Sequence, residues 1–436
     1  MAENKLTSAL IAALGNPNSA GDRIRSVSKE EITTGAEAEL VVRLLKLFPL
    51  SPDSSAKRVA GTPLRDVLAW MQKTKIKEAT TVFRELGGSE LLRIFDETIR
   101  ATIPDDKSHA QSELLFLLKI VCQYTPKGGV ERVVTAVRFP LLKDGFLWSV
   151  IFQTISNNRH PWRTEIVEEL RNPLPEGFSA VAYLDLCNTI ARSGELDHHP
   201  FDTEAGVVLL RGWLSQFDED SSSYAHSAAA SIPFLSPEAR ERVQLLADQH
   251  PDRGVRLEAA WAAAACGDAR GYQELEAACA RPQDASAAMH YLTELGAEDR
   301  IPSQAKSDDF KAISEMCHWL AHPMEFGTPP EEIHKVDSRE LFWPPTNDRR
   351  KMWVFQYAYA PGNGRTEPKI GHGMVGSVTF ALFGEATLDL TAEQVYGLHC
   401  AWELQNNRDA RAPQKRTAEA GIEILREHNP GFAEPN

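Results

Sequence analysis

The chain has 436 residues, 42% hydrophobic and 25% charged, a balance typical of globular proteins that bury a core without disulfides or metals. Its formal net charge of −14 disfavours binding to nucleic acid or to an anionic membrane surface, because both attract clustered Lys and Arg. The six cysteines form no CxxC pair and most lie in apolar stretches, which indicates a reducing, cytoplasmic environment. No apolar run approaches the roughly 20 residues of a membrane-spanning helix.

Residues 1 to about 325 carry apolar residues at helical spacing, separated by short links rich in Pro, Gly, Asn and Asp. At the N-terminus, Leu6, Leu10 and Leu14 fall on one helical face, which predicts a short amphipathic helix rather than a signal peptide. Farther along, Gly87 and Gly88 are predicted to end a helix with a left-handed turn. Helices of about three turns with short links stack as antiparallel pairs, so we expect an array of such pairs over 1–325.

Three segments between residues 223 and 297 are similar to one another. Tyr224 begins the first, Val255 begins the second 31 residues later, and Gly296 of the third aligns with Gly267 at an offset of 29. A repeating unit of about 30 residues that contains two helices indicates a helical solenoid. The sequence therefore predicts a mainly α-helical solenoid.

The clearest unit reads Asp252-Arg253-Gly254-Val255-Arg256-Leu257-Glu258-Ala259-Ala260 and closes with Gly267-Asp268. This segment resembles the first helix of a HEAT repeat of the short bacterial type, and the resemblance is clear over 223–297. In such a repeat, small alanines let neighbouring helices approach closely, Val255 packs inward and Gly267 permits the turn into the second helix. HEAT-repeat proteins include scaffolds, lyase-associated proteins and a few DNA-repair enzymes, so the resemblance implies an architecture and leaves the function open.

The composition changes near residue 325. Five prolines between residues 323 and 345 predict an irregular linker, which we assign to 326–348. Residues 349–436 are predicted to form a small, aromatic-rich α+β module. Side chains alternate over 352–359 and over 376–382, which indicates two strands joined by a glycine-rich hairpin loop at 361–373. Thr391 and Gln394 form a capping-box pattern at the start of one helix, and 414–428 is predicted to form a last one.

The weak catalytic candidates are His372, His399 and Cys400. A Cys–His nucleophile pair needs spatial contact, and neighbours on one helix point about 100° apart, so His372 in the predicted loop is the alternative base for Cys400. Glu385 and Asp389 would add polar groups to such a site. The simpler interpretation is that Cys400 is a buried core residue.

The weak metal-ligand candidates are His318 and His322, which are four residues apart at the end of a predicted helix. Two histidines at this spacing can share a metal, but the zincin pattern requires Glu at position 319, where this chain has Trp319. The simpler interpretation is one packed histidine and one histidine at a helix end.

Two further patterns are weaker. Gly371, Gly373 and Gly376 spell GxGxxG, but they lead into a predicted strand rather than a helix, so we expect them to shape a hairpin loop and bind no nucleotide. A basic cluster between the last two predicted helices is interpreted as a solvated link, with an anion contact as the alternative. It consists of Arg408, Arg411, Lys415 and Arg416.

These observations favour a protein-binding or scaffolding role, with an unidentified protein partner and no cofactor. The first alternative is an enzyme or enzyme accessory with a site between the last helical pairs and the hairpin. The second is a nucleic-acid-binding HEAT protein, which the acidic charge disfavours. A partly exposed aromatic patch would support the scaffolding role. A pocket in which His372 and His399 converge would support the enzyme, and a basic stripe would support the nucleic-acid binder.

Overall fold

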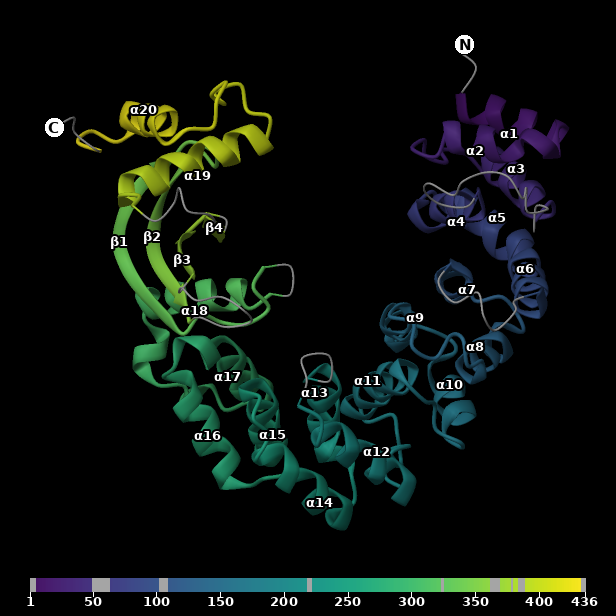
Figure 1. Ribbon diagram of the computed structural model, residues 1–436, viewed down its shortest axis with the longest axis horizontal. Coiled ribbons are helices and arrows are strands. Elements are labelled where there is room, and N and C mark those ends of the chain that lie inside the picture. Colours follow the sequence, from purple (N-terminus) through teal and green to yellow (C-terminus); the bar gives the residue numbers. More distant parts are fainter. Residues whose placement is uncertain are drawn as a thin grey trace. The chain divides into compact units, whose positions relative to one another are not determined.

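The computed structural model describes residues 5–48, 63–101, 109–217, 222–322, 325–360, 369–377, 379–382 and 389–432 (Figure 1). These residues are mainly helical, with one four-stranded antiparallel sheet among them, which confirms the coarse fold class. The chain divides into two compact units, which we call the N-terminal unit, Met1–Ala247, and the C-terminal unit, Asp248–Asn436. The division does not fall near residue 325, because the helices after residue 248 group with the sheet.

The N-terminal unit is helical throughout its described residues. Its helices are α1 (Lys5–Gly15), α2 (Ala20–Ser26), α3 (Gly35–Leu45), α4 (Pro63–Lys73), α5 (Lys77–Val82), a π-helical segment (Phe83–Gly87), α6 (Gly88–Ala101), α7 (His109–Tyr124), α8 (Gly129–Arg138), α9 (Leu147–Ser156), α10 (Arg163–Leu170), α11 (Phe178–Arg192), α12 (Glu204–Leu214), α13 (Ser222–Ala230) and α14 (Pro237–Asp248).

The helices of this unit lie in two rows (Figure 1). In the first row α4 contacts α7, α7 contacts α9, α9 contacts α11, and α11 contacts α13. In the second row α8 contacts both α6 and α10. Contacts of α6 with α7, α10 with α11 and α12 with α13 join the rows. Helices that are neighbours in sequence therefore alternate between the rows.

Gly87 and Gly88 do not end a helix, contrary to the sequence prediction. Gly88 has right-handed helical backbone angles, φ −57° and ψ −46°, and the chain passes through it from the π-helical segment into α6. A Cβ at Gly88 would lie 2.7 Å from Cβ of Pro126. Helix α6 meets the α7–α8 link at these two residues. Glycine is therefore required here for close approach and not for a left-handed turn.

The C-terminal unit combines helices with the sheet. Its elements are α15 (Arg253–Ala265), α16 (Ala269–Cys279), α17 (Pro282–Glu294), α18 (Asp308–Leu320), β1 (Glu332–Trp343), β2 (Asp348–Tyr359), β3 (Lys369–Val375), β4 (Phe380–Leu382), α19 (Ala392–Asn406) and α20 (Ala418–His428). The segment singled out by its repeat pattern forms the helical pair α15 and α16. Gly267, at φ +84°, makes the turn between them, and a Cβ at Gly271 would lie 2.5 Å from the carbonyl oxygen of Ala260. Small residues thus permit the close helix contact that the sequence predicts.

The sheet has the strand order β1-β2-β3-β4, with every neighbouring pair antiparallel. One face packs on α18 through Phe355, Tyr357 and Val375. The other face packs on α19 and α20 through Met352 and Met374. The unit therefore has three layers here, with helices covering both faces of the sheet (Figure 1).

Two boundaries predicted in this region are wrong. Strand β1 occupies much of the segment assigned to a linker, 326–348, because it is an edge strand whose charged residues hide any apolar alternation. Strand β3 begins at Lys369, inside the segment assigned to a hairpin loop, 361–373. Gly371 of this strand is needed for packing, since a Cβ there would lie 2.5 Å from Cζ of Tyr357 on β2.

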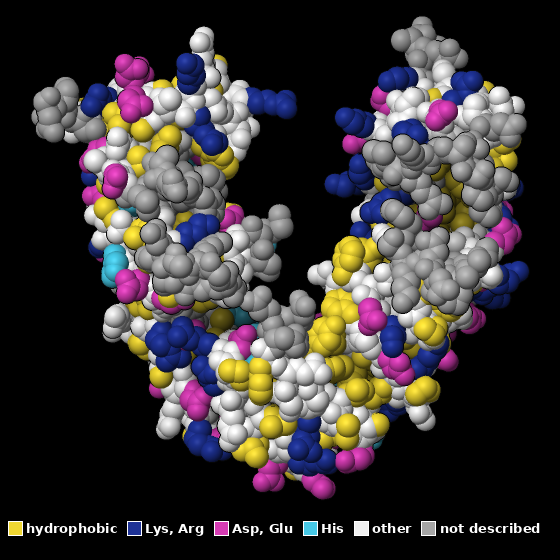
Figure 2. Space-filling view, viewed as in Figure 1, with side chains coloured by type: hydrophobic (Ala, Val, Ile, Leu, Met, Phe, Trp, Pro, Cys, Tyr) yellow, Lys and Arg dark blue, Asp and Glu magenta, His cyan; other side chains and the backbone are white. Residues whose placement is uncertain are grey.

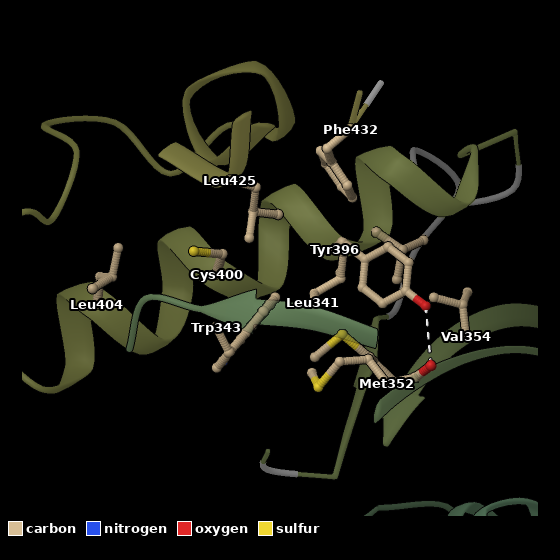
Figure 3. Packing of buried hydrophobic residues seen from close by; sticks show 11 residues of the cluster. Leu341, Trp343, Met352, Val354, Tyr396, Cys400, Leu404, Leu425 and Phe432 are labelled. Atoms are coloured by element: carbon tan, nitrogen blue, oxygen red, sulfur yellow. Dashed lines mark hydrogen bonds between the residues drawn. The ribbon is translucent and has the colours of Figure 1, made fainter. Parts of the chain in front are cut away.

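Helices α19 and α20 cross at two glycines. A Cβ at Gly421 would lie 1.7 Å from the carbonyl oxygen of Gly397, and a Cβ at Gly397 would lie 2.4 Å from the carbonyl oxygen of Ala418. The backbones are therefore in direct contact. This contact brings Leu425 of α20 into the same core as Tyr396 of α19, whose hydroxyl donates to the carbonyl oxygen of Met352 at 3.3 Å (Figure 3).

Candidate functional site

A polar cluster lies between α19 and the sheet in the C-terminal unit. Nδ1 of His399 lies 3.3 Å from Oε1 of Glu403, one helical turn later on α19. Oε2 of Glu403 accepts hydrogen bonds from Nε1 of Trp343 at 3.1 Å and from Oγ of Ser377 at 2.9 Å. The side chains of His399, Trp343 and Glu403 are at most 4% exposed. The cluster therefore joins β1, the end of β3 and α19.

The charge state of this cluster follows from its burial. Burial lowers the pKa of His399, although the neighbouring carboxylate partly offsets that effect. Burial by itself would raise the pKa of Glu403, but hydrogen bonds from His399, Trp343 and Ser377 bring it below its ordinary value. Both shifts favour a neutral imidazole beside an ionised carboxylate. The cluster holds three elements together, and it lines none of the cavities of about 640, 410 and 220 Å³ found among the described residues.

Cys400 lies in the hydrophobic core together with Leu404 of α19 and Leu425 of α20 (Figure 3). Burial raises the pKa of its thiol to about 12. A nucleophilic cysteine requires a lowered pKa and access to a substrate, so this position does not favour nucleophilic catalysis. The location matches the simpler interpretation of Cys400 as a small core residue.

Cys400 should therefore resist alkylation in the folded protein. With iodoacetamide at pH 8, we expect it to react at least about a hundredfold more slowly than the partly exposed Cys266, since reaction proceeds through the thiolate. Peptide mass spectrometry over a time course measures both rates in one sample, and a urea-denatured sample gives the unprotected rates. Equal rates in the folded protein would contradict the buried position.

His372 lies on β3, opposite Gln356 of β2, and is 2% exposed. It is two residues from Met374, so its side chain lies on the face of the sheet that packs on α19. The structure thus places His372 and His399 on the same side of the sheet. Neither histidine lines the cavities of about 640, 410 and 220 Å³ found among the described residues. Asp389 is exposed, and Glu385 lies outside the described residues.

His318 is exposed on α18, and His322 is exposed beyond the end of that helix. Between them, Trp319 is 37% exposed. Over the described ranges, no group of three or more His, Cys, Asp and Glu side chains is arranged to hold a metal ion. These two histidines could supply two ligands at most, fewer than a zinc site requires.

The two weaker patterns have structural explanations. Gly371 and Gly373 lie within β3, which pairs with β2 and β4, so they open no helix that could face a pyrophosphate. Arg411 donates to both carboxylate oxygens of Asp409, at 3.0 and 2.8 Å, and to the carbonyl oxygen of Pro344 at 2.7 Å. That arginine fixes the α19–α20 link against the β1–β2 turn.

An exposed aromatic surface lies on the N-terminal unit, at the first turns of three helices in the first row. We call this surface the aromatic edge and define it as Phe146, Phe178 and Tyr224, which precede or begin α9, α11 and α13. Phe146 is 70% exposed, and the other two are half-buried. The rings of Phe178 and Tyr224 lie 6.1 Å apart. Figure 2 shows hydrophobic side chains gathered on this face, over α9 and α11.

Hydrogen bonds fix the backbone of the aromatic edge. The amide of Ser179 donates to the carbonyl oxygen of Lys143 at 2.8 Å, which holds the turn before α11 against the turn before α9. A carboxylate oxygen of Asp144 accepts from the amide of Phe178 at 3.4 Å. Because both turns are joined in this way, Phe146 and Phe178 are presented together.

A chain of buried rings supports the edge from inside. Successive centroids lie 5.4 to 6.1 Å apart along Trp148–Phe152, Phe152–Tyr183, Tyr183–Phe201, Phe201–Trp213 and Trp213–Tyr224. Aromatic pairs at these distances stabilise one another beyond their buried area. Tyr224, and through it Phe178, is therefore supported by a packed series of rings.

The sequence carries a signal for this surface that our prediction missed. Asp144-Gly145-Phe146 and Glu176-Gly177-Phe178 have the same acidic-Gly-Phe pattern, 32 residues apart. Glycine is needed in both copies: a Cβ at Gly145 would lie 2.1 Å from a methyl group of Leu115, and Gly177 has φ +62°. Two short matching turns in otherwise different helices give too little similarity to reveal a repeat without the structure.

Comparison with protein-family models, curated proteins and solved structures found no match to this chain. The resemblance to HEAT repeats therefore stays a prediction from the residues. Of the helices that the structure describes, none combines the length and apolar composition that a bilayer span requires.

Proposed function

We propose that this protein is a scaffolding or adaptor protein that binds a partner protein at the aromatic edge of its N-terminal unit. The observation that carries the proposal is the exposure of Phe146, 70% of whose surface is accessible, beside two further aromatic rings on joined turns. Exposed aromatic side chains on a rigid base are typical of the residues that dominate binding energy in protein interfaces. The partner would insert apolar side chains between these rings.

The finer architecture is part of the same proposal. We infer a HEAT-like solenoid from the alternation of successive helices between two rows and from the matching turns 32 residues apart. In such an array, the same point of each repeat faces the same surface, so aromatic residues at equivalent turns form a line. Five of the six cysteines are buried thiols, which supports action in a reducing compartment such as the cytoplasm.

The test compares variants of the full-length protein as bait in affinity capture from the lysate of its native host. Phe146→Ser and Phe178→Ser should each reduce recovery of a stoichiometric partner at least tenfold, since truncating an interface aromatic residue typically costs about 2 kcal/mol or more. Quantitative mass spectrometry measures the recovery. The partner, once identified, is then purified and its dissociation constant measured for each variant.

Val208→Ser is the matched control. Val208 is 56% exposed on α12, in the second row of the same unit, so this substitution also removes an exposed apolar side chain. Its partner recovery should equal that of the unaltered protein. If all three variants capture the same proteins in the same amounts, the aromatic edge is not the binding surface and the proposal is wrong.

A further inference from the structure

Strand β1 lies at one edge of the sheet, and among the described strands only β2 pairs with it (Figure 1). Such an edge presents backbone N–H and C=O groups that can pair with another strand. One position of this edge is already capped. The carboxamide of Asn429, just beyond α20, accepts from the amide of Phe342 at 2.8 Å and donates to its carbonyl oxygen at 3.0 Å. Asn429 therefore takes the place of a residue on a neighbouring strand.

This cap identifies the residues of β1 whose backbone groups point away from β2. In an antiparallel pair, hydrogen-bonded and non-hydrogen-bonded residues alternate along each strand. Since the cap binds both backbone groups of Phe342, those of Glu340 and Ser338 also point outward. The register with β2 skips Val336, so the next outward residue is Lys335. On this side, the backbone groups of these last three residues have no hydrogen-bond partner within the described ranges.

We propose that the free edge of β1 pairs with the same edge of a second copy of this chain, in antiparallel orientation about a twofold axis at Ser338. In this register Ser338 lies opposite Ser338 of the partner subunit, and Lys335 lies opposite the partner's Glu340. Each of these facing pairs exchanges two backbone hydrogen bonds. The pairing ends on both sides at Phe342, whose outward groups are already bound by the cap.

The charges along this edge complement one another in that register. Lys335 lies opposite the partner's Glu340, Asp337 lies opposite the partner's Arg339, and the symmetry repeats each pair. Opposite charges directly across two antiparallel strands stabilise the pairing, and like charges destabilise it. Sliding the second strand by two residues would set Arg339 against the partner's Arg339 in one direction and Asp337 against the partner's Asp337 in the other. The charge pattern therefore selects the twofold axis at Ser338 and favours a second copy as the occupant.

Ion pairs within the chain hold these side chains at the edge. Arg339 binds Asp337 at 2.6 Å, and Glu340 binds Arg349 at 3.1 Å. A side chain that is already ordered loses less conformational entropy when it meets a partner charge. Glu340 is exposed and Asp337 and Arg339 are half-buried, so all three remain accessible to a second copy.

The first experiment is sedimentation equilibrium of the full-length protein, from about 1 to 100 µM, the range of a weak specific contact. Salt at about 150 mM screens the repulsion between two chains of net charge −14. We expect a reversible dimer. Ser338→Pro removes the outward amide at the twofold axis and should weaken dimerisation at least tenfold, because two backbone hydrogen bonds are lost by symmetry. Ser338→Ala, the matched control, keeps that amide and should leave the dimerisation constant unchanged.

The second experiment exchanges the charges. Lys335→Glu and Glu340→Lys each place like charges opposite each other, so each variant alone should dimerise at least tenfold more weakly than the unaltered protein. An equimolar mixture of the two variants should associate again, because every facing pair then joins one glutamate to one lysine. Recovery in the mixture also shows that both variants are folded.

A protein that stays monomeric at about 100 µM would overturn the proposal and leave the edge to a strand of another protein. A dimer that Ser338→Pro does not weaken would overturn it as well, because the contact would then lie elsewhere. Failure of the charge-exchanged mixture to associate would exclude the pairing of Lys335 with the partner's Glu340. None of these results bears on the aromatic edge, which belongs to the N-terminal unit.

Discussion

Replacing Gly421 by alanine should destabilise the C-terminal unit by at least about 3 kcal/mol. The new methyl group would lie 1.7 Å from the carbonyl oxygen of Gly397, a backbone atom of α19 that cannot rotate away. Helices α19 and α20 would have to separate along their whole contact, which would expose Leu425 and open the core shared with Trp343. Overpacking between two backbones is costlier than overpacking against a flexible side chain. Hydrogen exchange of peptides from α19 and α20, measured against urea concentration, gives the loss of stability.

The matched control is Gly212→Ala on α12. A Cβ at Gly212 would meet no atom within 4 Å, and the residue is within a helix. There the substitution should stabilise the protein by about 1 kcal/mol, because alanine favours the helical backbone over glycine. Two identical substitutions should therefore have opposite effects. If Gly421→Ala were neutral, the close crossing of α19 and α20 would be wrong.

The N-terminal unit should lose about 2 kcal/mol of stability between pH 7 and pH 5 through one histidine, His199. This side chain is 4% exposed, and burial lowers its pKa to about 4, although Asp202 opposes and Arg171 adds to that effect. Nδ1 accepts a hydrogen bond from the amide of Phe201 at 3.3 Å, which requires that nitrogen to be unprotonated. The ring also stacks on Phe234, with centroids 6.1 Å apart.

The sign follows from the two states. In the unfolded chain His199 has its ordinary pKa of 6.5, and in the folded protein its pKa is about 4. Between these values the unfolded state binds a proton that the folded state does not, so stability is complete above about pH 6.5 and falls as the pH decreases toward 4. Urea denaturation at pH 7, 6 and 5, followed by circular dichroism, measures the slope.

His199→Asn should remove this slope, even if it lowers stability at pH 7. His198→Asn is the matched control, because the neighbouring His198 is exposed. That variant should keep the pH dependence of the unaltered protein. Identical slopes for the His199→Asn variant and the unaltered protein would show that another group causes the acid sensitivity.

The helical content of this chain is predictable from local patterns. The turn at Gly267 marks the end of α15 correctly, because a left-handed turn depends on a few neighbouring residues. Thr391 likewise begins α19 with the capping box that the sequence predicts. The burial of Cys400 also follows its apolar setting in the sequence.

The errors occur where a glycine or a strand serves a distant partner. Gly88 was predicted to end a helix but packs against Pro126. Gly371 was predicted to lie in a loop but packs against Tyr357 within the sheet. Strand β1 has no apolar alternation because an edge strand pairs on one side only and carries charges. None of these contacts is encoded by the neighbouring residues.

The proposed binding surface could not be predicted from the sequence either. Phe146 and Phe178 become one surface only because the amide of Ser179 binds the carbonyl oxygen of Lys143. The sequence by itself determined that the chain is mainly helical, with small residues at its helix contacts and an α+β segment at its end, since propensity and capping act over a few residues. The tertiary structure alone decided which side chains meet, because contacts between residues tens of positions apart depend on the packing of whole helices.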